Sequence, residues 1–427
     1  MRAVVPRSSQ GLQRWLLAMA AIAALAFAVG CGSTDDEGDS GGSGATGATS
    51  ATSAEQSASN EKDPIVVGMS GSLSGPLNVY DKPLLAAVEL AADDINKDGG
   101  ILGRQVKVVS NDNKTDINLV ERQAKALLEK DIDVMIPTCD YDLGGPAAKV
   151  ANEQGVLAIT CAGSPLFGAS GIGPLSYNSF PGVPTEGAVL ASFAKEKGFK
   201  RPYLLEDTSL EYSKNLCKYF EEAWKAISPG DPVVGKDTFV NSDQSIASQV
   251  TRLKGNKEAG FVMLCSYLPG GATALRQLRS GGVDLPTLGT IGFDGTAWIE
   301  AVPGLSDFYY AAPGAITGDD PNPDINDLFK RIKQKTGEAP PNSYPVMGYS
   351  EMQSIARAME AAGSTDAEAV AAALNKFSDE ELLAGPTTYT EDCHIPVGRP
   401  MRVMQFDGGK LSFLESIKPE SVPEAPC

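Results

Sequence analysis

The chain has little of what most enzymes use for catalysis. Among its 427 residues there is one histidine, His394, and no C-x-x-C pair. A single imidazole excludes a multi-histidine metal site and any mechanism that needs two imidazoles. The seven cysteines therefore favour neither a zinc ribbon nor a thioredoxin-like centre. The Walker A and H-E-x-x-H motifs are also missing. We therefore predict a protein that is not an enzyme and that needs no metal and no cofactor.

Positive charge is scarce as well. Lys and Arg total 36 against 54 Asp and Glu, which gives a formal net charge of −18. Such a surface repels phosphate backbones, so we expect no nucleic-acid partner. Hydrophobic residues make up 42% of the chain, which is enough for large cores, and its length predicts two or three domains.

No apolar run is long enough to cross a bilayer. Residues 1–30 carry three arginines and no acid, and the apolar run Trp15–Val29 is shorter than the roughly 20 residues that a span requires. This pattern predicts a signal peptide over residues 1–30. The following Ala28-Val29-Gly30-Cys31 resembles a bacterial lipobox, which implies that Cys31 is lipidated. A tilted membrane anchor and an ordinary exported protein are the alternatives.

Residues 31–62 are almost entirely Gly, Ser, Ala, Thr and acidic residues. They have too little apolar surface to offset the entropy of ordering, so we predict a disordered tether. An acidic body on such a tether is expected to stay just off an anionic membrane surface.

From residue 63 the pattern alternates between buried strands and amphipathic helices. Strand patterns occur at 64–68, 105–109, 133–136 and 156–160, and again at 202–205, 232–239, 259–264 and 287–290. Helical patterns lie between them, for example at 145–154. This alternation predicts two α/β units, each with a parallel sheet covered on both faces. The late β-like run Met401–Phe406 needs one of these sheets to join.

Ligands of open parallel sheets bind beyond the carboxyl ends of the strands. The segments that follow the predicted strands are 70–80, 139–142 and 161–164 in the first unit, and 206–212, 265–267 and 292–295 in the second. They combine small residues, aromatic rings and single carboxylates, which predicts a site for a small polar molecule.

The segments Gly71–Pro76, Asp94–Asn96 and Gly99–Arg104 resemble the opening of the type I periplasmic binding proteins of the branched-chain amino acid group, the solute receptors of ABC importers. The resemblance extends over nearly all of residues 63–415. It implies two flavodoxin-like, three-layer lobes joined by three crossings, which close on a ligand about a hinge. The implied lobes are 63–182 plus 315–386 and 183–314 plus 387–427.

The resemblance also implies roles for particular residues. A ligand carboxylate would meet hydroxyl and backbone N–H groups of the first lobe, and a ligand ammonium would meet a carboxylate of the second. The matching positions are Asp140, Tyr141, Ala162, Gly163 and Ser164 for the carboxylate, Asp294 for the ammonium, and Tyr80, Tyr212, Tyr267 and Tyr349 for the aromatic walls.

Asp140 departs from the family pattern, which has a small hydroxyl residue there. Its charge would repel a ligand carboxylate by about 4 kcal/mol at 4 Å for an effective dielectric constant of 20. We therefore expect a neutral, amide-like or cationic solute, unless the Asp140 side chain points away and only its N–H serves. Composition alone also allows Asp294 or Ser164 to be turn residues and the tyrosines to be core residues.

Six cysteines remain after Cys31, an even number in an exported chain, so disulfides are plausible. In the flavodoxin-like order that the resemblance implies, Cys139 and Cys161 end neighbouring strands, and we predict that they are bonded. Cys393 and Cys427 are a second candidate pair, and six buried thiols are the alternative.

The leading hypothesis is a monomeric receptor on the extracytoplasmic face, held to the membrane only by its lipid, that delivers a small polar solute to the permease subunits of an ABC importer. A ligand sensor of the same fold is the alternative. Less favoured is a surface hydrolase that uses Cys265, in principle paired with His394, or an Asp140/Asp294 pair.

Overall fold

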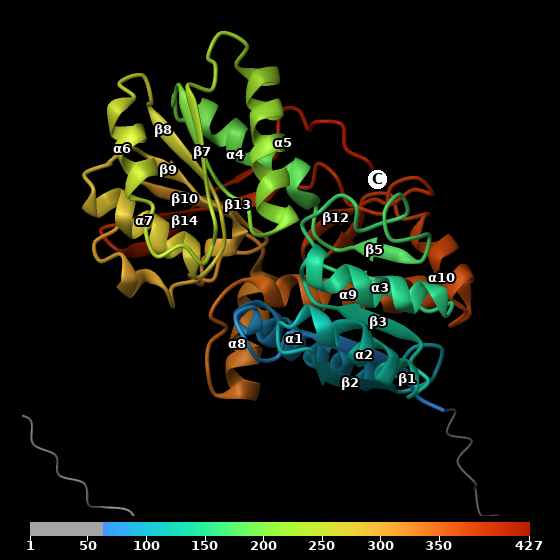
Figure 1. Ribbon diagram of the computed structural model, residues 1–427. Helices are drawn as coiled ribbons and strands as arrows, with labels where there is room; N and C mark the ends of the chain where they lie inside the picture. The colour runs from blue at the N-terminus through green and yellow to red at the C-terminus, as the bar shows by residue number, and fades with distance from the viewer. Residues whose placement is uncertain (1–62) are drawn as a thin grey trace, which may run out of the picture. The chain divides into compact units, whose positions relative to one another are not determined.

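The computed structural model describes residues 63–427. The predicted signal peptide, Cys31 and the tether up to residue 62 lie outside the described residues. In the described part, strands and helices alternate along the chain and form two α/β lobes (Figure 1). None of its helices is both long and apolar enough to cross a membrane.

The first lobe is built on a five-stranded parallel sheet in the order β2-β1-β3-β4-β5. Its strands are β1 (Ile65–Gly71), β2 (Val106–Asp112), β3 (Val134–Pro137), β4 (Leu157–Thr160) and β5 (Ser176–Asn178). This 2-1-3-4-5 order is that of flavodoxin-like folds and has a switch point between β1 and β3.

The second lobe repeats this order. Its seven-stranded sheet runs β14-β13-β10-β9-β8-β6-β7, so β7-β6-β8-β9-β10 forms the same parallel 2-1-3-4-5 arrangement. The strands are β6 (Pro202–Asp207), β7 (Gly235–Phe239), β8 (Phe261–Cys265), β9 (Thr287–Leu288), β10 (Phe308–Ala312), β13 (Met401–Asp407) and β14 (Lys410–Ile417). The last two strands come from the C-terminal tail and are antiparallel to their neighbours. The predicted β-like run Met401–Phe406 therefore joins the second sheet as β13.

Helices pack in pairs on these sheets. In the first lobe α2 packs on α3, and α1 packs on α9, which also contacts α8 and α10. In the second lobe α4 packs on α5 and α6 on α7 (Figure 1). The helices are α1 (Asn78–Lys97), α2 (Ile117–Leu128), α3 (Tyr141–Glu153), α4 (Gly182–Glu196), α5 (Glu211–Ile227), α6 (Ala247–Gly255), α7 (Gly270–Ser280), α8 (Pro323–Thr336), α9 (Tyr344–Ala362) and α10 (Ala367–Leu374).

Short elements complete the described chain. They are the 3-10 turns η1 (Ile291–Phe293) and η2 (Ile299–Ala301) and the hairpin strands β11 (Glu380–Leu382) and β12 (Gly385–Thr387). The predicted strand 287–290 is shortened to β9, because Thr290 caps η1 by accepting a hydrogen bond from the Gly292 N–H. The predicted helix 145–154 begins four residues earlier, because Asp140 caps α3.

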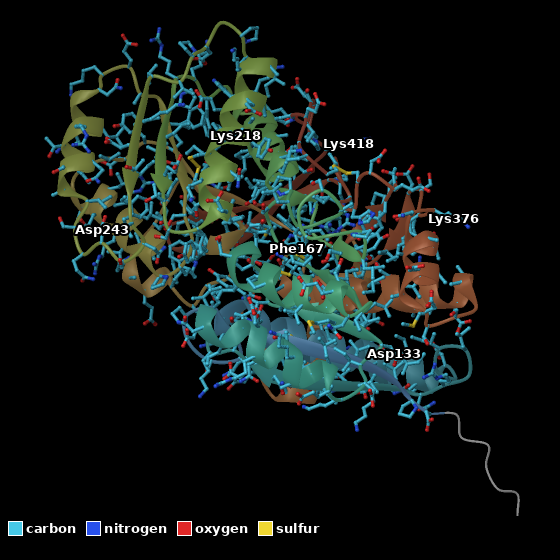
Figure 2. The ribbon with its side chains drawn as sticks, turned by 45° about the vertical axis from the view of Figure 1, so that its right-hand side comes forward. Asp133, Phe167, Lys218, Asp243, Lys376 and Lys418 are labelled. Atoms are coloured by element: carbon cyan, nitrogen blue, oxygen red, sulfur yellow. A yellow bond between two sulfur atoms is a disulfide. The ribbon has the colours of Figure 1, made fainter. Side chains whose placement is uncertain are left out.

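The central strand β8 shows why both faces of a parallel sheet must be covered. Phe261, Met263 and Cys265 enter one hydrophobic cluster, whereas the intervening Val262 and Leu264 enter another. Alternate side chains of a strand point to opposite faces, so five consecutive apolar residues require packing on both sides. Apolar and charged side chains are likewise separated: among the residues labelled in Figure 2, Phe167 is buried, whereas Lys218 and Lys376 are exposed.

The chain passes between the lobes three times. The first passage lies between β5 and α4, the second between β10 and α8, and the third between β12 and β13. Each passage takes the chain from one sheet to the other, so the two lobes share three connecting segments within the described residues.

Phe261 anchors the core between β8 and α5. Its ring centroid lies 5.5 Å from that of Trp224 and 5.8 Å from that of Phe199, and its side chain is fully buried. Phe261→Ala should lower the free energy of unfolding by about 3–5 kcal/mol, through lost burial and the cavity left behind. Urea unfolding with intact disulfides measures this. Val79→Ala, at an exposed position, is the control, and an equal loss in both variants would contradict the packing described.

Candidate functional site

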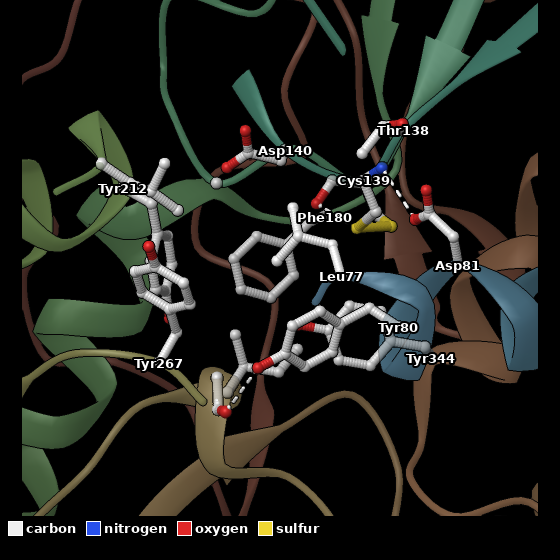
Figure 3. A pocket seen from close by; sticks show the side chains of 15 residues that line it. Leu77, Tyr80, Asp81, Thr138, Cys139, Asp140, Phe180, Tyr212, Tyr267 and Tyr344 are labelled. Atoms are coloured by element: carbon white, nitrogen blue, oxygen red, sulfur yellow. Dashed lines mark hydrogen bonds between the residues drawn. A yellow bond between two sulfur atoms is a disulfide. The ribbon is translucent and has the colours of Figure 1, made fainter. Parts of the chain in front are cut away.

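A small cavity, of about 40 Å³, lies between the two lobes (Figure 3). It is formed largely by segments at the carboxyl ends of strands in both sheets, among them the loops that follow β1 and β3 in the first sheet and β6 and β8 in the second, which are the switch points. Its lining residues are Leu77, Tyr80, Asp81, Thr138, Cys139, Asp140, Cys161, Gly163, Phe180, Leu210, Tyr212, Tyr267, Ile291, Gly292 and Tyr344. Switch points are where doubly wound folds bind ligands, so this cavity is the candidate site.

Asp140 contributes a buried carboxylate to the cavity wall. It has an extended backbone at the N-terminus of α3, where its Oδ1 accepts a hydrogen bond from the Leu143 N–H at 2.9 Å. Burial, reinforced by the neighbouring charge of Asp142, raises the pKa of Asp140 to about 7. The Asp140 N–H donates to the Thr138 carbonyl at 2.7 Å. Asp140 lines the cavity, and its N–H is already engaged within the protein, which does not favour the alternative in which only the N–H serves a ligand.

Asp81, on α1, is a second carboxylate of the wall, but it is occupied by the protein. Its Oδ2 accepts from the Ser72 N–H at 2.6 Å and its Oδ1 from the Cys139 N–H at 3.1 Å. Burial raises its pKa to about 6 despite these bonds. Asp81 therefore ties the loops after β1 and β3 to α1.

Tyr80 joins the two lobes across the cavity. Its hydroxyl donates to the Gly292 carbonyl at 2.8 Å and accepts from the Leu268 N–H at 3.3 Å, both in the second lobe. Its ring lies 4.9 Å from that of Tyr344, at the start of α9. A second bridge runs from the Glu211 N–H to Asp142 at 2.9 Å. The described arrangement is therefore one in which the lobes are in contact around the cavity.

Tyr212 forms the opposite wall and is held by a buried acid. Its hydroxyl lies 3.1 Å from both carboxylate oxygens of Glu186, which also accepts from the Ile291 N–H at 2.8 Å. Glu186 is fully buried in α4, and burial raises its pKa to about 8. Sequence reasoning missed Glu186. The available signal was a lone carboxylate in the otherwise apolar stretch 182–194.

Comparisons with known proteins agree with this architecture. A family model described as periplasmic binding protein matches residues 64–410. The chain belongs to the type I periplasmic binding proteins of the branched-chain amino acid group. As predicted, its fold is the mixed α/β two-lobe fold of that group.

Curated relatives and solved structures cover most of this family member. A Leu/Ile/Val-binding protein homolog from Brucella melitensis is 27% identical, over 82% of this chain and 94% of its own. A leucine-, isoleucine-, valine-, threonine- and alanine-binding protein from Pseudomonas aeruginosa is 26% identical, over 74% and 84%. The branched-chain amino acid transporter substrate binding protein LivJ from Streptococcus pneumoniae, solved with isoleucine, has a TM-score of 0.73 at 23% identity, covering 83% of this chain and all of that one.

Some predicted site residues lie in the cavity wall and others do not. Tyr80, Asp140, Gly163, Tyr212 and Tyr267 line it. The two neighbours of Gly163 do not line the cavity and form hydrogen bonds within the first lobe. The Ala162 carbonyl accepts from the Asn178 side chain, and Ser164 Oγ accepts from the Leu166 N–H at 3.3 Å. Tyr141 is the first residue of α3 and does not line the cavity.

Asp294 and Tyr349 are placed elsewhere. Asp294 is buried, but it accepts from the Ser343 N–H at 2.6 Å and from the Tyr310 hydroxyl at 3.1 Å, linking η1 to the start of α9. Tyr349 follows Tyr344 by five residues on α9, which turns it by roughly 140° around the helix axis. Its hydroxyl donates to Asp94 at 2.9 Å and it lines a separate surface depression. Tyr344 and Phe180, which the sequence reasoning did not select, complete the aromatic wall.

Three disulfides account for the six cysteines of the described chain. Cys139 and Cys161 are bonded at the ends of β3 and β4, in the cavity wall. Cys393 is bonded to Cys427, and Cys217 to Cys265. Cys265 thus has no thiol for a nucleophile, so the hydrolase hypothesis that used it is wrong.

His394 is also outside the cavity. Its ring stacks on Tyr177 at 4.0 Å, and its Nδ1 lies 2.8 Å from the Ser176 carbonyl. The described residues contain no cluster of three or more His, Cys, Asp or Glu that could hold a metal ion. The chemistry that the cavity offers is therefore hydrogen bonding, aromatic contact and negative charge.

Glu186 predicts a pH dependence of stability. Because burial raises its pKa from 4.5 to about 8, the folded state keeps a proton that the unfolded chain releases between these values. Stability should fall as the pH rises through this window, and Glu186→Gln should lose less stability than the wild type between pH 5 and pH 8. Urea unfolding at several pH values measures the difference. The control is Glu153→Gln on the exposed side of α3, and parallel curves for wild type and Glu186→Gln would refute the assignment.

Proposed function

We propose that the protein is a lipid-anchored, extracytoplasmic substrate-binding protein of an ABC importer. It captures a small polar solute, amino acid or amide-like in size, between its lobes and releases it to the permease subunits. The cavity at the switch points of both sheets carries this proposal, since its wall is completed only by residues of both lobes. No catalytic step is included, because capture needs only non-covalent contacts.

The relatives support the same role. Their names describe binding of leucine, isoleucine and valine, and in one case also threonine and alanine, which makes amino acids the first solutes to test. We further propose that residues 1–30 are removed, that Cys31 carries the lipid and that residues 31–62 tether the body. The lobes would then be 63–182 with 315–386 and 183–314 with 387–427, hinged at the three passages, in a monomer.

Calorimetry and small-angle scattering of the full chain test the proposal. Common amino acids, their amides and small amines form the panel. A true ligand should raise the melting temperature, because at 100 times Kd it adds about 2.7 kcal/mol to the free energy of unfolding, and it should change the distance between the lobes. Conversion of any panel compound to a product, or scattering and melting curves unaffected by every compound, would overturn it.

Tyr80→Phe should weaken solute binding by about 2- to 10-fold. It removes the hydroxyl that bonds Gly292 and Leu268 across the cavity, and one such hydrogen bond contributes about 0.5–1.5 kcal/mol. Calorimetry with the best panel ligand measures the change. Tyr141→Phe makes the same change outside the cavity and should leave the affinity unaltered, so equal losses in both variants would count against the bridging role.

A further inference from the structure

The charges that line the interlobe cavity are all of one sign. Its wall contains two carboxylates, Asp81 and Asp140, and none of its lining residues is a lysine, arginine or histidine. Both oxygens of Asp81 accept backbone N–H groups, from the loops after β1 and β3. The Asp140 carboxylate accepts from the first turn of its own helix, from the Leu143 N–H at Oδ1 and from the Asp142 N–H. A carboxylate has about four acceptor positions, so Asp140 has capacity left for a ligand.

The N-terminus of α3, where an anionic ligand group would be favoured, is already occupied by the Asp140 carboxylate. The N-terminus of a helix attracts anions because its first N–H groups are unpaired and its dipole is positive there. At α3 the protein's own carboxylate accepts from the third residue of the helix, Leu143. A ligand carboxylate would have to approach this buried anion in a cavity without a compensating cation, which is strongly unfavourable.

Aromatic rings form most of the remaining wall. Tyr80, Phe180, Tyr212, Tyr267 and Tyr344 surround the cavity below and beside Asp140 (Figure 3). The face of an aromatic ring carries negative potential, and several such faces around one carboxylate form the surroundings that hold organic ammonium ions. Leu77, Leu210 and Ile291 supply apolar contact for attached hydrocarbon.

We propose that the solute captured in this cavity is a small organic cation, an ammonium compound without a carboxylate, whose charge is paired with Asp140 and whose carbon groups contact the aromatic rings. This inference rests on the proposed function and narrows its substrate class. Such a solute differs from a zwitterionic amino acid in lacking the carboxylate, which is the group that Asp140 repels.

The electrostatics of the empty cavity agree with this assignment. The groups that face Asp140 are Asp142 on its own helix, Asp81 on α1 and Tyr267 from the second lobe, and none of them carries positive charge. With its pKa raised to about 7, Asp140 is partly protonated at neutral pH, and a bound cation would favour the ionised form. Affinity for a cation should therefore increase as the pH rises from 6 to 8.

Three compounds with the same hydrocarbon group separate the possibilities by charge. Isopentylamine is a cation throughout pH 6–8, leucine is a zwitterion and isocaproamide is neutral, and tetramethylammonium adds a smaller, permanently charged cation. Calorimetry with the full chain should show at least one cation binding ten-fold or more tightly than leucine and isocaproamide. Its affinity should increase between pH 6 and pH 8.

Asp140→Asn removes the charge but keeps a side chain that caps helices as well as aspartate does. It should lose the preference for the cation by ten-fold or more, with an unchanged melting temperature before ligand is added. Asp116→Asn is the matched control, since Asp116 caps α2 in the same lobe through the Asn118 N–H and lies outside the cavity. It should bind as the wild type does.

Tighter binding of leucine than of either cation would overturn the cation assignment while leaving solute capture intact. So would an unchanged cation affinity in Asp140→Asn, or no binding of either cation. The proposed function fails separately, when no compound of the wider panel binds or when one is converted to a product.

Discussion

The hydrogen bond from the Tyr80 hydroxyl to the Gly292 carbonyl joins the two lobes at the point where the site is formed. Tyr80 lies in the first turn of α1 in the first lobe, and Gly292 lies in η1 of the second. Each is also part of the cavity wall, so this interaction contributes both to the contact between the lobes and to the shape of the cavity. The Glu211–Asp142 and Ser343–Asp294 bonds join the same lobes at other points, which makes the wall a shared product of both sheets.

Buried carboxylates around this junction have different tasks although their chemistry is the same. Asp294 and Asp81 accept several hydrogen bonds and tie segments together. Glu186 orients Tyr212 and the backbone at Ile291. Asp140 accepts from the first turn of its own helix and joins no second loop. Because desolvation raises the pKa of a carboxyl, a buried carboxylate is costly unless hydrogen bonds, a ligand or a proton satisfy it, and carboxyls with raised pKa values concentrate at functional sites.

Loops that follow strands were predicted well, because the rule for parallel sheets depends only on strand order along the chain. Tyr80, Tyr212 and Tyr267 were found in this way. The rule did not predict in which direction the side chains of other loop residues point. Asp294 sits in a predicted loop, but its carboxylate faces Ser343, which is 49 residues away in sequence. Phe180 follows β5, a strand that was not predicted, and Glu186 lies within α4, so the rule selected neither of them.

Strand and helix alternation, the acidic surface and the scarcity of catalytic residue types can be read from the chain alone, because periodicity and composition are local properties. They determine two α/β units with an acidic surface. Which face of α9 meets the cavity and which acid remains available were decided by the packing of one lobe on the other, and the bond between Cys217 and Cys265 by the packing of α5 on β8 within the second lobe. Contacts of this kind join residues far apart in sequence, and their geometry exists only once both sheets are folded.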